Sequence, residues 1–285
     1  MVNGCWEISY FRIEEQERLE RRIFAFTLFS NLFYSKNMIK FENVQKKFGE
    51  IAALKDISFE IPEGEFVFLT GPSGAGKTTI LRLILKELPP SGGKIFVNNQ
   101  EVSKIKGKKV CEHRREIGVV FQDFKLLADR TVFENVSLPL EIKGISLAQI
   151  KKEVEETLKA VGLWERKDLF PIQLAGGELQ RTSLARAIIT RPKILLADEP
   201  TGNLDPKTSW QLVELIKGEN AKGVTVIMAT HNAGIVDFLK ERVIELQDGS
   251  IIRDQKKGSY EEAGRGDKKQ EEKKPKELKK IKKEK

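Results

Sequence analysis

The sequence has few of the residues that hold metal ions or form disulfides: two cysteines and two histidines among 285 residues. Cys5 and Cys111 lie far apart and form no Cys-x-x-Cys motif, so both are expected to be reduced thiols without a role. The two histidines, His113 and His231, are too few for a histidine-rich site. The chain is therefore not expected to bind a metal ion through protein ligands alone.

Long apolar runs are also missing. The best candidate, residues 23–29, is seven residues long and includes Thr27, whereas a membrane-spanning helix needs roughly 18 apolar residues. The stretch before it is rich in Glu and Arg and shows no small-residue cleavage site, which argues against a secretory signal. We therefore expect a protein made and kept in the cytosol, so that any membrane passage belongs to a partner.

The body of the chain also lacks a strong net charge, although the whole sequence carries +8. Residues 1–37 have as many acids as bases, residues 38–254 have 32 bases and 30 acids, and residues 255–285 have 13 bases and 7 acids. The excess belongs to a C-terminal tail that is predicted to be disordered, because it has few apolar residues. This tail is either simply solvated or attracted to an anionic membrane surface. Its lysines are not interleaved with aromatic residues, so nucleic-acid binding is not predicted.

From residue 38 to about 254, apolar strands alternate with helical segments, which predicts an α/β domain. One strand begins at Met38, and residues 193–198 and 223–230 are continuous apolar runs typical of strands covered on both faces. The preceding residues 1–37 are an N-terminal extension to which no role is assigned. The alternatives are a short amphipathic helix, an accessory extension and an upstream start codon chosen in error.

A mostly helical subdomain is predicted to be inserted at about residues 123–190. One of its helices begins with a capping box formed by Ser146 and Gln149 and ends at Gly162. Its apolar positions share one face: Ile150, Val154, Leu158 and Val161.

The glycine cluster "GPSGAGKTT" fits the pattern G-x-x-x-x-G-K-[ST], with a strand before it and a helix after it. Such a loop curls so that successive backbone N–H groups point at phosphate oxygens, and the helix adds its positive end. Lys77 is expected to reach the β and γ phosphates, and the Thr78 hydroxyl to bind Mg²⁺. The predicted phosphate-binding residues are Gly71, Pro72, Ser73, Gly74, Ala75, Gly76, Lys77, Thr78 and Thr79.

Two further strand ends carry groups suited to hydrolysis. Asp198 ends the apolar run "ILLAD" and is placed to hold Mg²⁺, while Glu199 can act as general base toward water. An isolated Asp-Glu pair is usually surface charge, but one that follows a buried strand favours function. His231 follows "VTVIMAT" and is expected to donate to a γ-phosphate oxygen. His113, in "CEHRREIG", is expected to be a solvated helix residue.

Six motifs in order resemble the nucleotide-binding subunit of an ABC transporter: "GPSGAGKTT", "VVFQD", "LAGGELQR", "ILLADEP", "GNLD" and "ATHN". The resemblance covers residues 38 to about 250 and implies a P-loop ATPase that binds ATP and Mg²⁺ and closes as a homodimer. It also implies that Gln122 joins the magnesium site to the helical subdomain and that Asp205 lies in a loop that crosses to the second copy. Phe48 falls where the family stacks an aromatic ring on adenine; a core phenylalanine is the alternative.

Residues 121–140 and 170–178 further resemble the FtsE subfamily, whose members act in cell division with the membrane protein FtsX. The resemblance implies peripheral attachment at the cytoplasmic face of the membrane and a signal to cell-wall hydrolases. Lipoprotein-extracting and macrolide-exporting ATPases share much of the pattern and are the alternative, although "DRTV" (129–132) favours the cell-division subfamily. A switch that closes on ATP but hydrolyses poorly fits less well, because Glu199 and His231 are intact. Docking to the membrane partner, or packing within the subdomain, is expected of Phe124, Leu126, Leu127 and Phe133.

The stretch "LAGGELQR" resembles the signature that completes the ATP site of the other copy. Its expected nucleotide-contacting residues are Ala175, Gly176, Gly177 and Glu178. Ala175 stands where the family usually has serine, and the missing hydroxyl removes one hydrogen bond to a charged phosphate, worth about 1.5 to 3 kcal/mol. We therefore expect a weakened site that still works.

Overall fold

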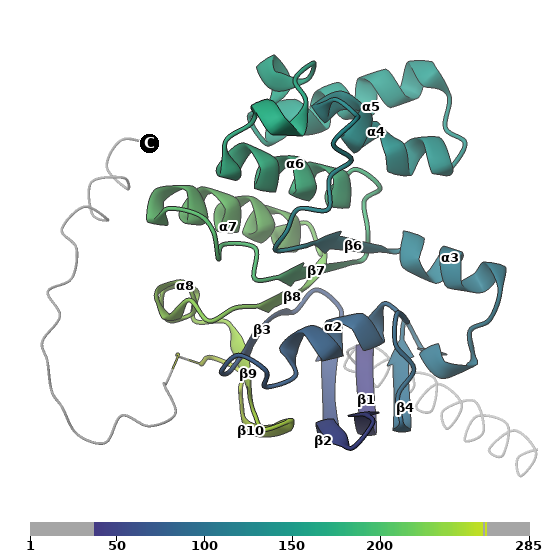
Figure 1. Cartoon of the computed structure of the whole chain (residues 1–285), viewed down its shortest axis with the longest axis vertical. Coiled ribbons are helices and arrows are strands. Elements are labelled where there is room, and N and C mark those ends of the chain that lie inside the picture. Colours follow the sequence, from purple (N-terminus) through teal and green to yellow (C-terminus); the bar gives the residue numbers. More distant parts are fainter. Residues whose placement is uncertain (1–36, 259, 261–285) are drawn as a thin grey trace, which may run out of the picture.

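The computed structural model describes residues 37–258 and 260. The predicted N-terminal extension and most of the basic tail lie outside these residues. The described chain forms an antiparallel sheet, a mostly parallel sheet and a group of helices (Figure 1).

The antiparallel sheet has the strand order β2-β1-β4-β5. Its strands are β1 (Asn37–Phe48), β2 (Ile51–Pro62), β4 (Gly92–Val97) and β5 (Gln100–Glu101). The strand predicted from Met38 is β1, and its buried residues include Ile39, Phe41 and Val44. The ring of Phe41 stacks on Phe59 of β2 with centroids 4.5 Å apart. The sequence pattern predicts the strand at Met38 but not the whole sheet.

The second sheet has the order β10-β9-β3-β8-β7-β6, and only β10 at its edge runs antiparallel to its neighbour. Its strands are β3 (Phe66–Thr70), β6 (Ile117–Val120), β7 (Ile194–Asp198), β8 (Thr225–Ala229), β9 (Arg242–Gln247) and β10 (Ser250–Gln255). Every residue of β3 and β8 is buried, as their continuous apolar sequence predicts. Because β3, β8 and β7 are parallel neighbours, their carboxyl ends meet at one edge of the sheet.

Helices cover both faces of this sheet. On the face toward the antiparallel sheet, α2 (Lys77–Ile84) contributes Ile80 and Ile84 to a shared core. On the other face, α7 (Pro206–Ala221) and α8 (Ala233–Leu239) cover a second cluster that contains Phe68 and Met228. A short 3-10 turn (Val102–Lys104) and α3 (Lys108–Arg115) connect the antiparallel sheet to β6.

The remaining helices pack around a third apolar cluster and lie at the top of Figure 1. They are α4 (Val132–Ile142), α5 (Leu147–Ala160) and α6 (Gly176–Ile188), with short 3-10 turns at Trp164–Arg166 and Pro171–Gln173. The four predicted apolar residues of α5, from Ile150 to Val161, are buried. Ser146 accepts the Gln149 N–H at 3.4 Å, and Gly162 follows the helix with a φ of 69°. The complete capping box, with both bonds present, belongs instead to Thr131 and Glu134 at the start of α4, which have the T-x-x-E pattern.

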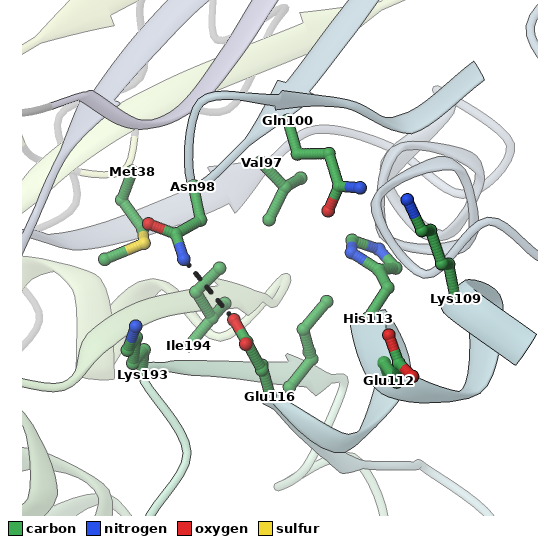
Figure 2. Close-up of a pocket in the computed structure, with 11 residues that line it drawn as sticks. Met38, Val97, Asn98, Gln100, Lys109, Glu112, His113, Glu116, Lys193 and Ile194 are labelled. Atoms are coloured by element: carbon green, nitrogen blue, oxygen red, sulfur yellow. Dashed lines mark hydrogen bonds between the residues drawn. The ribbon is translucent and has the colours of Figure 1, made fainter. Parts of the chain in front are cut away.

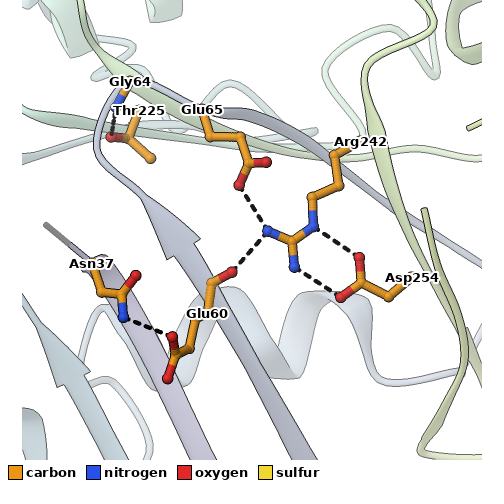
Figure 3. Close-up of polar contacts among 7 residues, drawn as sticks. All are labelled: Asn37, Glu60, Gly64, Glu65, Thr225, Arg242 and Asp254. Carbon is orange, nitrogen blue, oxygen red and sulfur yellow. Dashed lines mark hydrogen bonds and ion pairs between the residues drawn. The ribbon is translucent and has the colours of Figure 1, made fainter. Parts of the chain in front are cut away.

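A polar cluster around Arg242 ties the two sheets together (Figure 3). Its guanidinium donates two bonds of 2.8 Å to the Asp254 carboxylate, one of 2.7 Å to Glu65 and one of 2.7 Å to the Glu60 carbonyl oxygen of β2. Asp254 and Glu65 raise the pKa of Arg242, because hydrogen bonds to carboxylates stabilise the cation. The cluster holds β9 and β10 against β2 through charge-assisted bonds.

The prediction that His113 is solvated is wrong. The side chain is buried, and its Nε2 lies 2.7 Å from the Ile84 carbonyl oxygen of α2. It lines a cavity of about 190 Å³ beside Gln100 and Lys109 (Figure 2). The burial of His113 could not be predicted from "CEHRREIG", because its neighbours are polar and the eight-residue helix α3 has too few apolar residues to show a buried face. Burial lowers the pKa of His113.

Candidate nucleotide-binding site

The loop between β3 and α2 forms one wall of a cavity of about 570 Å³. Its glycines, Gly71, Gly74 and Gly76, have positive φ angles, which lets the backbone curl. The cavity is lined by Gly71, Pro72, Ser73, Gly74, Gly76, Lys77, Thr78, Thr79, Gln122, Glu199, His231 and Tyr260. Of the predicted phosphate loop, Ala75 alone is outside this lining, and it is buried against the first core.

Lys77 begins α2 and is almost entirely buried. Its Nζ donates to the carbonyl oxygens of Gly71 at 2.8 Å and Pro72 at 3.1 Å, and lies 3.8 Å from Glu199 Oε1. The ammonium is thus fixed inside the curl of the loop. The Lys77 ammonium and the N-terminus of α2 therefore lie side by side, and both attract polyphosphate.

Thr78 and Asp198 approach each other across the sheet edge, with the Thr78 Oγ1 donating to Asp198 Oδ1 at 3.1 Å. Burial is the main cause that raises the pKa of Asp198, and the bond from Thr78 opposes it. A hydroxyl and a carboxylate are the oxygen ligands that Mg²⁺ prefers when phosphate and water complete its shell. Among residues 37–258 and 260, no group of three or more His, Cys, Asp and Glu side chains is arranged to hold a metal. The donor set therefore fits Mg²⁺ bound together with a nucleotide.

Glu199 directly follows β7 with φ of 47°, a backbone conformation that costs a non-glycine residue energy. Its N–H donates to the Ala229 carbonyl oxygen of β8 at 2.9 Å, which helps to hold this turn. The carboxylate then faces Lys77 on one side and His231 on the other, where the His231 Nδ1 lies 2.7 Å from Glu199 Oε2. The turn brings an acid and an imidazole together at the cavity, as a general base and its positioning partner require.

Gln122 lines the same cavity from the segment that follows β6. In the same segment, Phe124 and Lys125 both have positive φ. Their carbonyl oxygens accept bonds of 2.9 and 2.7 Å from Arg186 of α6. Ser183 of α6 also donates to the Phe124 carbonyl oxygen at 3.2 Å. Arg186 and Ser183 thus connect α6 to the loop that carries Gln122. The sequence around these two residues contains no motif that predicts this contact.

The residues of "LAGGELQR" do not line this cavity. Ala175 is the N-cap of α6, and its N–H donates to Glu178 Oε2 at 2.9 Å. This bond is the first cause that lowers the pKa of Glu178, which also bonds Arg166 at 3.0 Å. A Cβ atom added to Gly177 would lie 2.3 Å from Thr208 Cγ2 of α7, so glycine at this position permits close packing within the chain. A Cβ atom added to Gly176 would lie 3.8 Å from its nearest neighbour.

Three other predicted site residues also lie outside the cavity lining: Asp198, which contacts Thr78 as described above, Asp205 and Phe48. Asp205 is the N-cap of α7 and accepts the Thr208 N–H at 3.1 Å, and bonds from Thr208 lower the pKa of Asp205. Phe48, at the end of β1, is 45% exposed, with the Lys46 ammonium 5.0 Å from its ring centroid. The alternative that Phe48 is a core residue is therefore wrong.

The predicted docking residues divide between surface and interior. Leu127 is exposed, and Phe124 and Leu126 are partly buried. Phe133 packs against the third cluster, so packing within the helical region explains it. Asn135 fixes the segment by accepting the Leu127 N–H at 2.8 Å and donating to the Leu127 carbonyl oxygen at 3.0 Å.

No helix in the described part of the chain is long and apolar enough to cross a bilayer. A phosphate-binding loop after β3, an acid at the end of β7 and a second carboxylate beside it, all at one edge of a mostly parallel sheet, define a P-loop ATPase. The family described as "ABC transporter" matches residues 54–202, and the chain belongs to this family of ATP-hydrolysing, ATP-binding domains.

Similar proteins carry the name cell division ATP-binding protein FtsE. That of Bacillus subtilis is 49% identical over 224 residues, which cover 78% of this chain and 98% of the relative. Those of Mycobacterium tuberculosis and Escherichia coli K12 are both 46% identical, over 78% and 75% of this chain and 98% and 97% of the relatives. The dimeric cassette MJ0796 in a post-hydrolysis state with ADP and Pi has a TM-score of 0.72, 39% identity, and coverage of 78% of this chain and 100% of the cassette.

Proposed function

We propose that this chain is the ATPase subunit of a cell-division complex of the FtsE–FtsX type. The observation that carries the proposal is the single cavity where Lys77, Thr78, Glu199 and His231 meet. The names of its relatives in three bacteria support cell division as the process. In this proposal ATP drives closure of a homodimer, and the movement reaches a membrane subunit that controls cell-wall hydrolysis.

We assign the work of hydrolysis to residues of the cavity together with Asp198 and Phe48, which lie outside its lining. Lys77 and the loop N–H groups bind the β and γ phosphates of ATP, and Phe48 stacks on adenine. Thr78 Oγ1, the Asp198 carboxylate and Gln122 would hold Mg²⁺, which would offset charge on the phosphates. Glu199 accepts a proton from the attacking water, and His231 orients that carboxylate and donates to a γ-phosphate oxygen. The 2.7 Å contact between His231 and Glu199 supports this pairing.

The second copy completes each site. Ala175, Gly176, Gly177 and Glu178 begin α6 outside the cavity of their own chain, so their exposed helix start is available to the γ-phosphate of another copy. Asp205 caps α7 through the Thr208 N–H, and Thr208 also lies against Gly177. We assign Asp205 to the loop that crosses to the second copy. Contact with an FtsX-like membrane subunit is assigned to the helical region around Leu127, and peripheral attachment at the cytoplasmic face follows from it. The basic tail would add attraction to anionic lipid.

The substitution Glu199→Gln tests the catalytic assignment. We expect hydrolysis to fall about 10²-fold or more, because the amide cannot accept the proton, while ATP still binds. Turnover is measured by phosphate release and binding by a fluorescent ATP analogue. Glu219→Gln, on α7 and outside the cavity, is the matched control and should hydrolyse ATP like the wild type. Near-normal turnover in Glu199→Gln would contradict the assignment.

Co-purification separates cell division from transport. The tagged chain is isolated from detergent-solubilised membranes of its own cells with ATP present, and the membrane proteins that accompany it are identified. A four-span protein with a large extracellular loop supports the FtsX-type assignment. A lipoprotein-extracting or macrolide-exporting permease would instead favour the transport alternative.

A further inference from the structure

The chain that follows β10 returns to the nucleotide cavity. Ordered contacts continue past the predicted start of the tail at residue 255, since Gln255 ends β10 and Gly258 is buried against β9. The Gly258 N–H donates to the Glu241 carbonyl oxygen at 3.0 Å. A side chain at Gly258 would lie 2.6 Å from Val243 Cγ2, so the absence of one permits this close approach.

Two residues later, Tyr260 is held beside α8. Its N–H donates to Asp237 Oδ1 at 2.6 Å, and its side chain packs partly buried against the second apolar cluster. From this position Tyr260 lines the cavity together with the phosphate loop and His231. Asp237 belongs to the helix that begins two residues after His231, so Tyr260 enters from the His231 side of the cavity.

We propose that Tyr260 is a nucleotide-binding residue whose phenolic hydroxyl donates a hydrogen bond to the γ-phosphate of ATP bound to the same chain. This inference rests on the proposed function of the cavity. Tyr260 shares the wall of the cavity with Lys77 and the phosphate loop. A phenolic O–H is a donor, and phosphate oxygens are acceptors of its hydrogen bond. Phe48 lies outside the cavity lining, and the adenine contact stays assigned to that residue and not to Tyr260.

The contact links the C-terminal segment to nucleotide state. In this proposal Tyr260, which lies within the predicted tail at residues 255–285, takes part in ATP binding.

The test compares Tyr260→Phe with the wild type in the full-length chain. Isothermal titration calorimetry with Mg²⁺ measures affinity for a non-hydrolysable ATP analogue and, separately, for ADP. We expect the analogue to bind about tenfold more weakly to Tyr260→Phe, as for a lost hydrogen bond to a charged group, and ADP to bind within twofold of the wild type. The ring remains, so the packing against the second cluster is retained.

Gly258→Ala is a second variant. It keeps the Tyr260 hydroxyl but disturbs the close contact of residue 258 with Val243, which holds the backbone before Tyr260. We expect it to weaken analogue binding in the same direction, while Gly218→Ala, at an exposed position of α7 with open space around it, does not. Unchanged analogue affinity in Tyr260→Phe, or an equal loss for ADP, would overturn the assignment. A wild type that binds neither nucleotide would overturn the proposed function as well, whereas normal wild-type binding with an unaffected variant overturns the Tyr260 assignment alone.

Discussion

Replacing Ala175 by serine should strengthen two different interactions, one inside the chain and one between copies. Ala175 has the N-cap backbone conformation, with φ −70° and ψ 157°, and a serine oxygen there would accept the Glu178 N–H. A good N-cap in place of alanine stabilises a helix by about 0.5 to 2 kcal/mol, so the unfolding free energy of the monomer should rise by about 1 kcal/mol.

The same hydroxyl is expected to face the γ-phosphate of the second copy. A hydroxyl has one donor and two acceptor positions, so capping α6 and donating to phosphate are compatible. A hydrogen bond to a charged group contributes about 1.5 to 3 kcal/mol, which corresponds to about tenfold to a hundredfold tighter closure. ATP-driven dimerisation, measured by sedimentation velocity at several protein concentrations, should show this gain.

Ala175→Asp separates the two effects. Aspartate caps a helix about as well as serine, so the unfolding free energy should rise for both variants in urea titrations. Its negative charge repels phosphate, so ATP-driven dimerisation should fall below the wild type for aspartate and rise above it for serine. Serine that stabilises the monomer without tightening the dimer would show that the hydroxyl only caps α6, and would refute the shared-site reasoning at this position.

Three further predictions concern residues that support the site or the fold. Arg242→Lys should lower the unfolding free energy by about 2 kcal/mol in urea titrations, because lysine cannot reproduce the four bonds to Asp254, Glu65 and Glu60; an unchanged midpoint would contradict this role. The lowered pKa of buried His113 means that the unfolded chain binds a proton more readily, so stability should decrease as the pH falls below about 6.5. His113→Gln should lose less stability between pH 7 and pH 5.5, and equal losses would refute the assignment. Arg186→Lys should keep ATP-analogue affinity but lower turnover several-fold, because one of the bonds that fix the Gln122 loop is lost; unchanged turnover would remove Arg186 from that role.

The sequence predicted those parts of the site that short segments determine. The phosphate loop is a strand, a glycine turn and a helix within one stretch, and Asp198, Glu199 and His231 each follow a recognisable apolar strand. Parallel pairing then places all of them at one edge, which is why the pattern was readable without coordinates.

Residues whose partners are distant in sequence were not predictable in this way. Arg242 meets Glu60 and Glu65 about 180 residues away, and Arg186 meets carbonyl oxygens about 60 residues away. Such polar contacts leave no periodicity in the chain. His113 looked solvated because its neighbours are charged, and Tyr260 looked like part of a tail because little apolar sequence surrounds it.

The central claim is that ATP closes two copies of this chain around shared sites. Sedimentation velocity of Glu199→Gln, which should bind ATP without consuming it, tests the claim most directly. We predict a dimer with ATP and Mg²⁺ and a monomer with ADP, and Lys77→Ala added to the same protein should abolish the dimer. A Glu199→Gln protein that binds ATP and remains monomeric at all concentrations would contradict the claim.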